Sequence, residues 1–178
     1  FATPGLRADY EALLPRYREK FHTIHNGFDP ADFEHLTPER PCPGPTLILT
    51  GKFHFYTPGV AEGLMRVLAD FPGLCFLYVG GEADLIRRLA GEAGVAARVW
   101  TLEFQPVERM LRLIQGADYA LLTHAVCYAV GTKIFDYLAL GKPVLCFVPT
   151  GSAISASFAH IPGVVIRHPP FGEAEIRE

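Results

Sequence analysis

The stretch DYALLTHAVCYAVGTKIFDYLALGKPVLCFV (residues 118–148) decides the fold, because it predicts a strand, a helix and a second strand in succession. Residues 118–123 and 143–148 are short, apolar and rich in Val, Leu and aromatic side chains. Such runs are typical of strands that helices cover on both faces. Residues 132–140, between them, carry apolar side chains at helical spacing. Two strands joined in this way run parallel, with a right-handed crossover.

The same alternation continues outward from this stretch. Three earlier strands, LILTG, CFLYVG and RVWTL, begin at residues 47, 75 and 98. A sixth strand is expected at residues 164–167, after which the sequence turns polar and leaves the sheet. Further helices are expected at residues 58–70, 83–93, 107–115 and 153–160. The sequence therefore predicts an α/β protein with a doubly wound, Rossmann-like parallel sheet.

The first part of the chain departs from this pattern. Residues 6–19 have apolar side chains at helical spacing, although Pro15 is expected to kink or end that helix. Residues 21–24 predict a short strand, and residues 25–33 (HNGFDPADF) contain Asn-Gly and Asp-Pro turn signals. Four prolines follow within residues 37–45. This segment predicts a linker and a domain boundary.

The composition suits one globular unit. The 178 residues are 49% hydrophobic and 20% charged, which supplies a sizeable core and excludes a disordered chain. The net charge of −3 argues against a protein that mainly binds nucleic acid, because that function needs a concentrated basic surface. The longest apolar stretch, residues 119–130, is shorter than the roughly 20 residues of a membrane-spanning helix. We expect no nucleic acid partner and no membrane span.

The first residue and the cysteines bear on the setting of the chain. The sequence begins at Phe1 and shows no signal-peptide pattern, so we expect a fragment of a longer polypeptide. The cysteines are far apart, and three lie in apolar segments: Cys42, Cys75, Cys127 and Cys146. A packing role for Cys127 and a reduced, cytoplasmic setting are expected. No spacing of His or Cys predicts a metal site.

Candidate functional residues follow the strands, because ligands of doubly wound sheets bind at the carboxyl ends of the strands. Gly131 permits close approach of a ligand to the helix expected at residues 132–140, whose free N–H groups favour an anion. Thr132, Lys133 and Asp136 share one arc of that helix. A diphosphate beside Lys133 would place a ribose one turn further along, within reach of the Asp136 carboxylate. The arc predicted to face the core carries Ile134, Phe135 and Leu138. The same residues also allow a plain surface pair between Lys133 and Asp136, worth about 0.2–0.5 kcal/mol.

Four segments, taken in order, carry a family resemblance. DYLALGKPV (136–144) is similar to a helix with the pattern E-A-x-A-x-G-x-P-V, and IHNGFDPADF (24–33) to an N-G-x-D-x-x-x-F linker. FLYVGGEADLIRRLAGEAGV (76–95) is similar to a V-G-x-G strand, loop and helix, and RVWTLEFQPVERMLRLIQGADYALL (98–122) to a segment beside a nucleobase. Together they resemble the C-terminal, donor-binding half of GT-B glycosyltransferases, particularly family 4 (group 1).

The resemblance implies a metal-independent glycosyltransferase that moves a sugar from a UDP- or GDP-sugar to an acceptor in polysaccharide or glycolipid synthesis. Fixed positive groups would stabilise the departing diphosphate in place of a metal ion, so no cofactor is expected. The residues implied to bind the donor are Gly51, Lys52, Gly131, Thr132, Lys133 and Asp136, with Asp136 on the ribose. Contacts with the base or the donor sugar are implied for Leu102, Glu103, Phe104, His124 and Tyr128.

The resemblance also implies a domain division. Residues 1–25 would be a remnant of the N-terminal acceptor domain, residues 26–45 the interdomain linker and residues 46–178 the donor-binding domain. The missing part of the N-terminal domain would bind the acceptor, a glycan or a lipid-linked sugar. This chain alone should then be inactive. The whole protein would be cytoplasmic and would associate with the inner face of the membrane through the missing domain.

The sequence departs from the family at two points. The family's pair of acids seven residues apart would need an acid where Tyr128 stands, so the sugar contacts and the retaining outcome are not inherited. Residues 51–59 (GKFHFYTPG) lack the family's second lysine, for which His54 or Tyr56 is a substitute. His124 either contacts the donor or is satisfied by local hydrogen bonds. Residues 102–104 either lie at the base or merely connect a strand to a helix.

Other functions fit parts of the sequence. A nucleotide-sugar epimerase of the GT-B fold would share the donor site without an acceptor. A non-catalytic, doubly wound nucleotide-binding or regulatory module is a further alternative, but a phosphoacceptor module needs clustered acids where this chain has Thr50, Gly51 and Lys52. A nicotinamide-binding domain is disfavoured because GKFHFY, and not G-x-G-x-x-G, follows the first strand.

Overall fold

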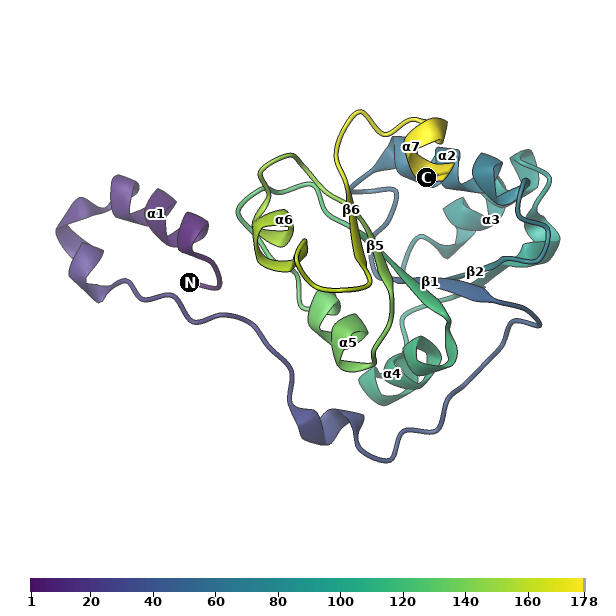
Figure 1. The fold of residues 1–178 in the computed structure, drawn as a ribbon, viewed down its shortest axis with the longest axis horizontal. Coiled ribbons are helices and arrows are strands. Elements are labelled where there is room, and N and C mark those ends of the chain that lie inside the picture. The colour runs from purple at the N-terminus through teal and green to yellow at the C-terminus, as the bar shows by residue number, and fades with distance from the viewer. Residues whose placement is uncertain (178) are drawn as a thin grey trace.

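The computed structural model describes residues 1–177 and is built around one sheet of six parallel strands (Figure 1). The strand order is β3-β2-β1-β4-β5-β6. The strands are β1 (Thr46–Thr50), β2 (Cys75–Val79), β3 (Val99–Leu102), β4 (Tyr119–Thr123), β5 (Val144–Phe147) and β6 (Val164–Arg167). The order begins in the middle of the sheet and reverses direction between β3 and β4, as in a doubly wound fold. The predicted fold class and the six strands predicted for the sheet are confirmed.

Helices cover both faces of the sheet, because right-handed connections change sides where the direction reverses. One face carries α2 (Pro58–Leu68) and α3 (Ala83–Glu92), and α7 (Glu173–Arg177) packs beside α2 (Figure 1). The other face carries α4 (Val107–Gly116), α5 (Lys133–Ala139) and α6 (Ala153–Phe158). A short 3₁₀ helix, η3 (Ala96–Arg98), precedes β3.

The central strands are buried on both faces, which explains their continuous apolar sequences. β1 and β2 are buried at every position. In β1, Leu47 and Leu49 pack against α2 and α3, whereas Ile48 packs into the core beneath α4 and α5. β3 lies at the edge and is only half-buried along its length.

A fully buried tyrosine attaches α5 to the end of β1. The hydroxyl of Tyr137 accepts a hydrogen bond from the backbone N–H of Thr50 at 3.2 Å and pairs with Thr50 Oγ1 at 3.1 Å. Ile134 is also fully buried, but Phe135 and Leu138, predicted to face the core with it, are only partly buried. Tyr137 is therefore the second anchor of this helix, and its contacts fix how α5 faces the sheet.

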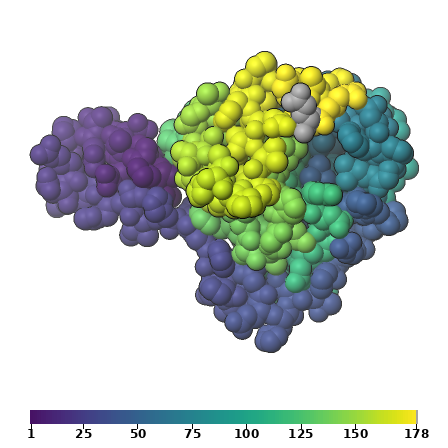
Figure 2. Space-filling model, in the orientation of Figure 1, coloured from purple at the N-terminus to yellow at the C-terminus, as the bar shows by residue number. Residues whose placement is uncertain are grey.

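The N-terminal segment forms a lobe that projects from the body of the molecule (Figure 2). α1 (Pro4–Leu13) is followed by a 3₁₀ helix, η1 (Pro15–Lys20). The helix predicted over residues 6–19 is therefore split at Pro15, whose ring cannot continue a helix. No residue of either helix is buried, so this lobe contributes nothing to the two cores of the sheet.

The strand predicted at residues 21–24 is wrong, because this segment lies outside the sheet. The backbone N–H of Ile24 donates to Phe1 O at 2.8 Å, and the amino group of Phe1 donates to His22 O at 2.8 Å. The segment therefore runs beside the first residue of the chain. A third 3₁₀ helix, η2 (Pro30–Phe33), follows and begins at the cap that Asp29 provides.

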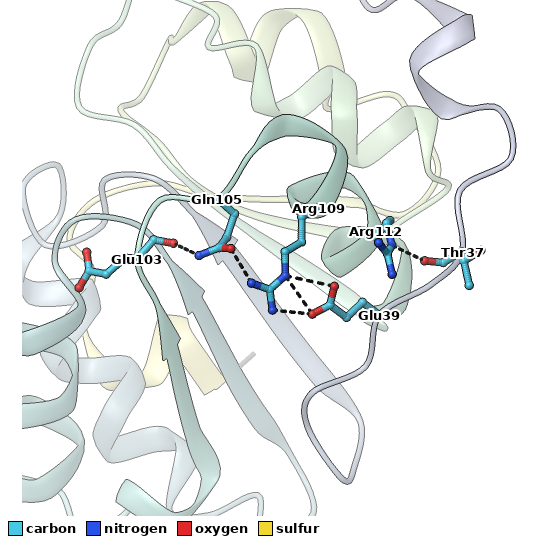
Figure 3. A network of polar contacts seen from close by, with 6 residues as sticks. All are labelled: Thr37, Glu39, Glu103, Gln105, Arg109 and Arg112. Carbon is cyan, nitrogen blue, oxygen red and sulfur yellow. Dashed lines mark hydrogen bonds and ion pairs between the residues drawn. The ribbon is translucent and has the colours of Figure 1, made fainter.

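The later part of the predicted linker lies along α4 (Figure 3). The carboxylate of Glu39 accepts from Arg109 Nε at 3.1 Å and from Nη2 at 2.8 Å. The backbone carbonyl of Arg112 accepts from the N–H of Glu39 at 3.0 Å, and the Nε of its side chain donates to the carbonyl of Thr37 at 3.1 Å. A side chain at Gly116 would overlap the Glu39 carbonyl, so this close approach requires glycine. These residues are fixed to the sheet-bearing part of the chain.

The cysteines and the helix lengths bear on two further expectations. Cys42, Cys75 and Cys146 are buried free thiols, but Cys127 is exposed, so the expectation that it packs in the core is wrong. It follows β4 in a loop at the surface, where its apolar neighbours do not cover it. Within residues 1–177, every helix is too short or too polar to cross a bilayer.

Tyr137→Phe is expected to lower the free energy of unfolding by about 1–3 kcal/mol, because the buried Thr50 groups lose their partner. Urea denaturation followed by circular dichroism measures the change. Tyr119→Phe removes a hydroxyl from a side chain that is 49% exposed and is the matched control. Equal stability of the two variants would contradict the anchoring role of Tyr137.

Candidate functional site

The carboxyl ends of β1 and β4 lie side by side at the point where the connections reverse direction. Doubly wound proteins bind ligands at such a switch point, because the loops diverge there and leave a crevice. Gly51 follows β1 with a φ angle of +87°, which favours glycine. His124 follows β4. Two of the predicted site residues therefore flank the switch point.

Lys133 reaches from the start of α5 to the end of β1. A Cβ atom on Gly51 would overlap Lys133 Nζ and would lie 2.7 Å from Cε. The ammonium group therefore lies against the backbone of Gly51, in the space that any side chain would fill. Gly51 is required both for its positive φ angle and for its missing Cβ.

The environment of Lys133 favours an anionic ligand. Burial lowers the pKa of Lys133, the charges of Glu82 and Asp136 raise it, and the charge of Lys52 lowers it. An ammonium group that has lost water is stabilised by any anion that replaces the lost interactions. This group can thus bind a phosphate or a carboxylate at the switch point.

Asp136 lies on α5, one helical turn beyond Lys133. Burial raises the pKa of Asp136, the charge of Asp32 raises it further, and the charge of Lys133 lowers it. Asp32 belongs to η2, so the predicted linker also faces this part of the site. Because Lys133 Nζ lies against Gly51, the structure does not use Lys133 and Asp136 as a plain surface pair.

Lys52 is exposed and lies beside the same space. Its Nζ atom is 4.1 Å from the centroid of the Phe55 ring, in a cation–π contact. Its charge reaches Lys133, whose pKa it lowers. The two lysines therefore lie in one positively charged region, with Lys133 half-buried and Lys52 exposed.

Glu82 is a residue of this region to which the sequence assigned no role. Its carboxylate accepts hydrogen bonds from the backbone N–H of Phe53 at 2.6 Å and of Phe55 at 2.9 Å. These two residues belong to the loop that carries Lys52. The available signal was in residues 79–82, where VGGE has an acid in place of the second glycine of V-G-x-G.

Leu102 is the last residue of β3, and Glu103 and Phe104 follow it, two strands from β1 and therefore roughly 10 Å away. Phe104 is 74% exposed, and its ring lies against Gly81, where an added Cβ would be 2.9 Å from Cε2. An exposed ring of this kind can stack with a nucleobase. Leu102 is partly buried against the core and its carbonyl accepts from Gly80 N–H at 2.9 Å, so it is the strand's anchor.

The loop after β3 is tied to the predicted linker (Figure 3). The carbonyl of Glu103 accepts from Gln105 Nε2 at 2.8 Å, and Gln105 Oε1 accepts from Arg109 Nη1 at 2.7 Å. Arg109 also holds Glu39. The side chain of Glu103 is exposed. The predicted linker therefore helps to hold the loop after β3, through the chain of contacts from Glu39 to Arg109 and Gln105.

His124 is satisfied by a local hydrogen bond at one of its two ring nitrogens. Its Nδ1 accepts from the N–H of Val126 at 3.1 Å, which satisfies one nitrogen locally. Its ring stacks on Tyr56, with centroids 5.3 Å apart, and its Nε2 lies 4.0 Å from where a Cβ of Gly131 would be. Burial lowers the pKa of His124, the hydrogen bond with Val126 opposes this effect, and the charge of Lys133 lowers the pKa further, which favours the neutral ring. The other nitrogen is left for a ligand.

Thr132 and Tyr128 are less closely associated with the lysines. Thr132 is exposed and its side chain does not cap α5. The carbonyl of Tyr128 accepts a hydrogen bond from the Thr3 hydroxyl. The Cβ atom of Tyr128 lies 3.6 Å from the position that a Cβ on Gly5 would take. The structure thus places Tyr128 against the N-terminal lobe.

Two further features concern ligands of other kinds. Across the described residues, 1–177, no group of three or more His, Cys, Asp or Glu side chains is placed to hold a metal ion. An apolar groove of about 380 Å³ lies at the opposite end of the sheet, where β1, β4 and β5 begin. Leu47, Tyr119 and Val144 are among the residues that line it. Among the residues that the structure describes, Arg177 is the one charged residue that lines it, whereas charged residues of both signs surround Lys133 at the carboxyl ends of the strands.

Asp136→Asn is expected to raise the free energy of unfolding at pH 7. The pKa of Asp136 is raised in the folded chain above its ordinary value of 3.8, so the folded state loses stability as the pH rises through the interval above 3.8. The neutral amide avoids this loss. Urea denaturation at pH 4 and pH 7 should show a larger gain at pH 7.

Asp9→Asn, on the exposed face of α1, is the control and should change stability by less than about 0.5 kcal/mol. If Asp136→Asn lowers stability at pH 7, the ionised carboxylate is stabilised by the fold and the described balance of charges is wrong.

Comparisons with known proteins identify the fold. No protein-family model and no curated protein matches the sequence. Among solved structures, WaaG, a glycosyltransferase involved in lipopolysaccharide biosynthesis, is 17% identical with a TM-score of 0.73 over 99% of this chain and 50% of WaaG. HepE from Anabaena, in complex with UDP and glucose, is 18% identical with a TM-score of 0.70 over 99% of this chain and 50% of HepE. Sucrose-phosphate synthase from Thermosynechococcus elongatus is 19% identical with a TM-score of 0.64 over 96% of this chain and 45% of that protein.

This chain therefore spans about half the length of the structures that it matches. At these identities the likeness concerns the fold, and it confirms the fold that the sequence motifs predicted. The chain has the fold of the C-terminal half of GT-B glycosyltransferases.

Proposed function

We propose that this chain is the donor-binding half of a glycosyltransferase that moves a sugar from a UDP- or GDP-sugar to an acceptor in polysaccharide or glycolipid synthesis. One observation carries the proposal: Lys133 Nζ lies against Gly51 at the switch point of the sheet. A half-buried ammonium beside bare backbone suits a phosphate, which needs both positive charge and close approach.

The chemistry of glycosyl transfer gives this site its task. The bond between the anomeric carbon and the diphosphate breaks, and negative charge grows on the departing diphosphate. Positive groups that are already in place stabilise that charge without reorganisation. Lys133 is held at the switch point and Lys52 lies beside it, so we propose that they serve in place of a metal ion.

The positions of the other residues support an orientation for the nucleotide. Asp136 lies one turn beyond Lys133 and would accept hydrogen bonds from the ribose hydroxyls. Phe104 lies two strands away with its ring exposed and would stack with the base. The donor would then cross the ends of β3, β2 and β1 from base to diphosphate. His124, beside β4, would face the donor sugar.

The comparisons give this proposal a precedent. HepE from Anabaena is described in complex with UDP and glucose, and WaaG is a glycosyltransferase of lipopolysaccharide biosynthesis. Because this chain spans about half of each, we propose that its other partners are an N-terminal domain and the glycan or lipid-linked acceptor that this domain binds. The whole protein would act in the cytoplasm at the inner face of the membrane, and the present chain alone would bind donor without turnover.

Isothermal titration calorimetry with UDP, GDP, uridine and pyrophosphate tests the site. The chain should bind at least one nucleoside diphosphate. Lys133→Ala should weaken the nucleotide and pyrophosphate about 10- to 100-fold, because a charge-assisted contact is worth about 1.5–3 kcal/mol. Asp136→Ala should weaken the binding of UDP or GDP and of uridine, but not the binding of pyrophosphate.

Lys20→Ala removes a distant lysine of η1 and serves as the control for net charge. The proposal fails if no nucleotide in the panel binds at millimolar concentration. It also fails if Lys20→Ala weakens binding as much as Lys133→Ala does.

A further inference from the structure

The loop between β1 and α2 carries Lys52, and the carboxylate of Glu82 forms hydrogen bonds with its backbone. Glu82 is half-buried at the start of α3, and both its oxygens are used: Oε2 by the N–H of Phe53 at 2.6 Å and Oε1 by the N–H of Phe55 at 2.9 Å. Two backbone donors that converge on one carboxylate fix the loop between them. Glu82 thus acts as a clamp on a loop that comes 29 residues earlier in the chain.

The inner and outer halves of this loop depend on Glu82 to different extents. Phe53 is 0% exposed and is held by the core in any case. Phe55 is 65% exposed, so its backbone bond to Glu82 is the main restraint described for it. Lys52 Nζ in turn lies over the ring of Phe55, in the cation–π contact. The position of Lys52 therefore depends on Glu82 through Phe55.

A second set of contacts joins Glu82 to the residue that receives Lys133. The hydroxyl of Tyr78 donates to the carbonyl of Gly51 at 2.6 Å and accepts from the backbone N–H of Glu82 at 3.1 Å. The ends of β1 and β2 and the start of α3 are thereby tied together. The charge of Glu82 also acts on Lys133, where it opposes the effect of burial and favours the charged ammonium.

We propose that Glu82 is a positioning residue for the diphosphate of the donor: its carboxylate fixes the loop between β1 and α2 so that Lys52 and Lys133 face the same anion. This inference rests on the proposed function, because it assigns Glu82 a part in binding at the same site. Glu82 touches neither the donor nor the acceptor and acts through the loop and the two lysines.

The charge of Glu82 makes the test decisive, because two effects have opposite signs. A carboxylate near the diphosphate repels it, so an acid with no positioning role would strengthen nucleotide binding when it is neutralised. A positioning acid has the reverse effect, because its removal frees the loop and moves Lys52 away from Lys133. The direction of the change in affinity therefore separates the two.

The experiment compares Glu82→Gln with the unmodified chain and with Glu92→Gln, which neutralises an exposed acid at the far end of the same helix. Calorimetry with UDP and with uridine measures binding, and amide hydrogen exchange measures the protection of Phe53 and Phe55. Glu82→Gln should weaken UDP at least tenfold, leave uridine unchanged and speed exchange at Phe55. Glu92→Gln should change none of these.

The outcomes distinguish the inference from the function on which it rests. If the unmodified chain binds no nucleotide, the proposed function fails and the inference fails with it. If the chain binds UDP but Glu82→Gln leaves its affinity unchanged or raises it, the inference alone is overturned. Equal losses for UDP and uridine would mean general damage to the fold and would also overturn it. Should Glu82→Gln not fold, Glu82→Asp keeps the charge but cannot span both amides, and the same loss for UDP alone is expected.

Discussion

The contact between the Lys133 ammonium and the backbone of Gly51 is the constraint on which the rest of this site depends. A charged group is held half-buried at the centre of the sheet, in a space that exists only because Gly51 has no side chain. The end of β1 must therefore be fixed, and α5 must present Lys133 at the correct height. Tyr137, Tyr78 and Glu82 meet these needs through hydrogen bonds to Thr50, Gly51 and the loop beyond them.

The same arrangement shows how a fold of this class separates stability from binding. Ile134 and Tyr137 face the core from α5, while Lys133 and Asp136 occupy the side that faces the switch point. Burial moves the pKa of both charged residues toward their neutral forms. The fold therefore carries an electrostatic cost at the site that an anionic ligand with hydroxyl groups is suited to relieve. That cost is the physical ground for the proposed binding of a nucleoside diphosphate.

The sheet could be predicted from the sequence because strands covered on both faces have continuous apolar runs, as residues 47–50 and 76–79 do. Lys133 and Asp136 could be singled out because helical periodicity fixes which residues share an arc. The contact of Lys133 with Gly51 could not be predicted, because it depends on the orientation of α5 relative to β1. The hydrogen bonds of Tyr137 to Thr50 fix that orientation. The contacts of Glu82 could not be predicted for a related reason: its partners are backbone N–H groups of a distant loop, which leave no pattern in side-chain spacing. The attachment of the linker to α4 through Glu39 and Arg109 is equally invisible in a segment that reads as proline-rich and polar.

A crystal structure of the chain with UDP tests the central claim most directly. The account predicts that the diphosphate lies at the end of β1, with an oxygen in hydrogen-bond contact with Lys133 Nζ, beside Gly51, and with the ribose hydroxyls at Asp136. A nucleotide bound elsewhere, with its diphosphate away from both Gly51 and Lys133, would contradict the account even if the affinity were high.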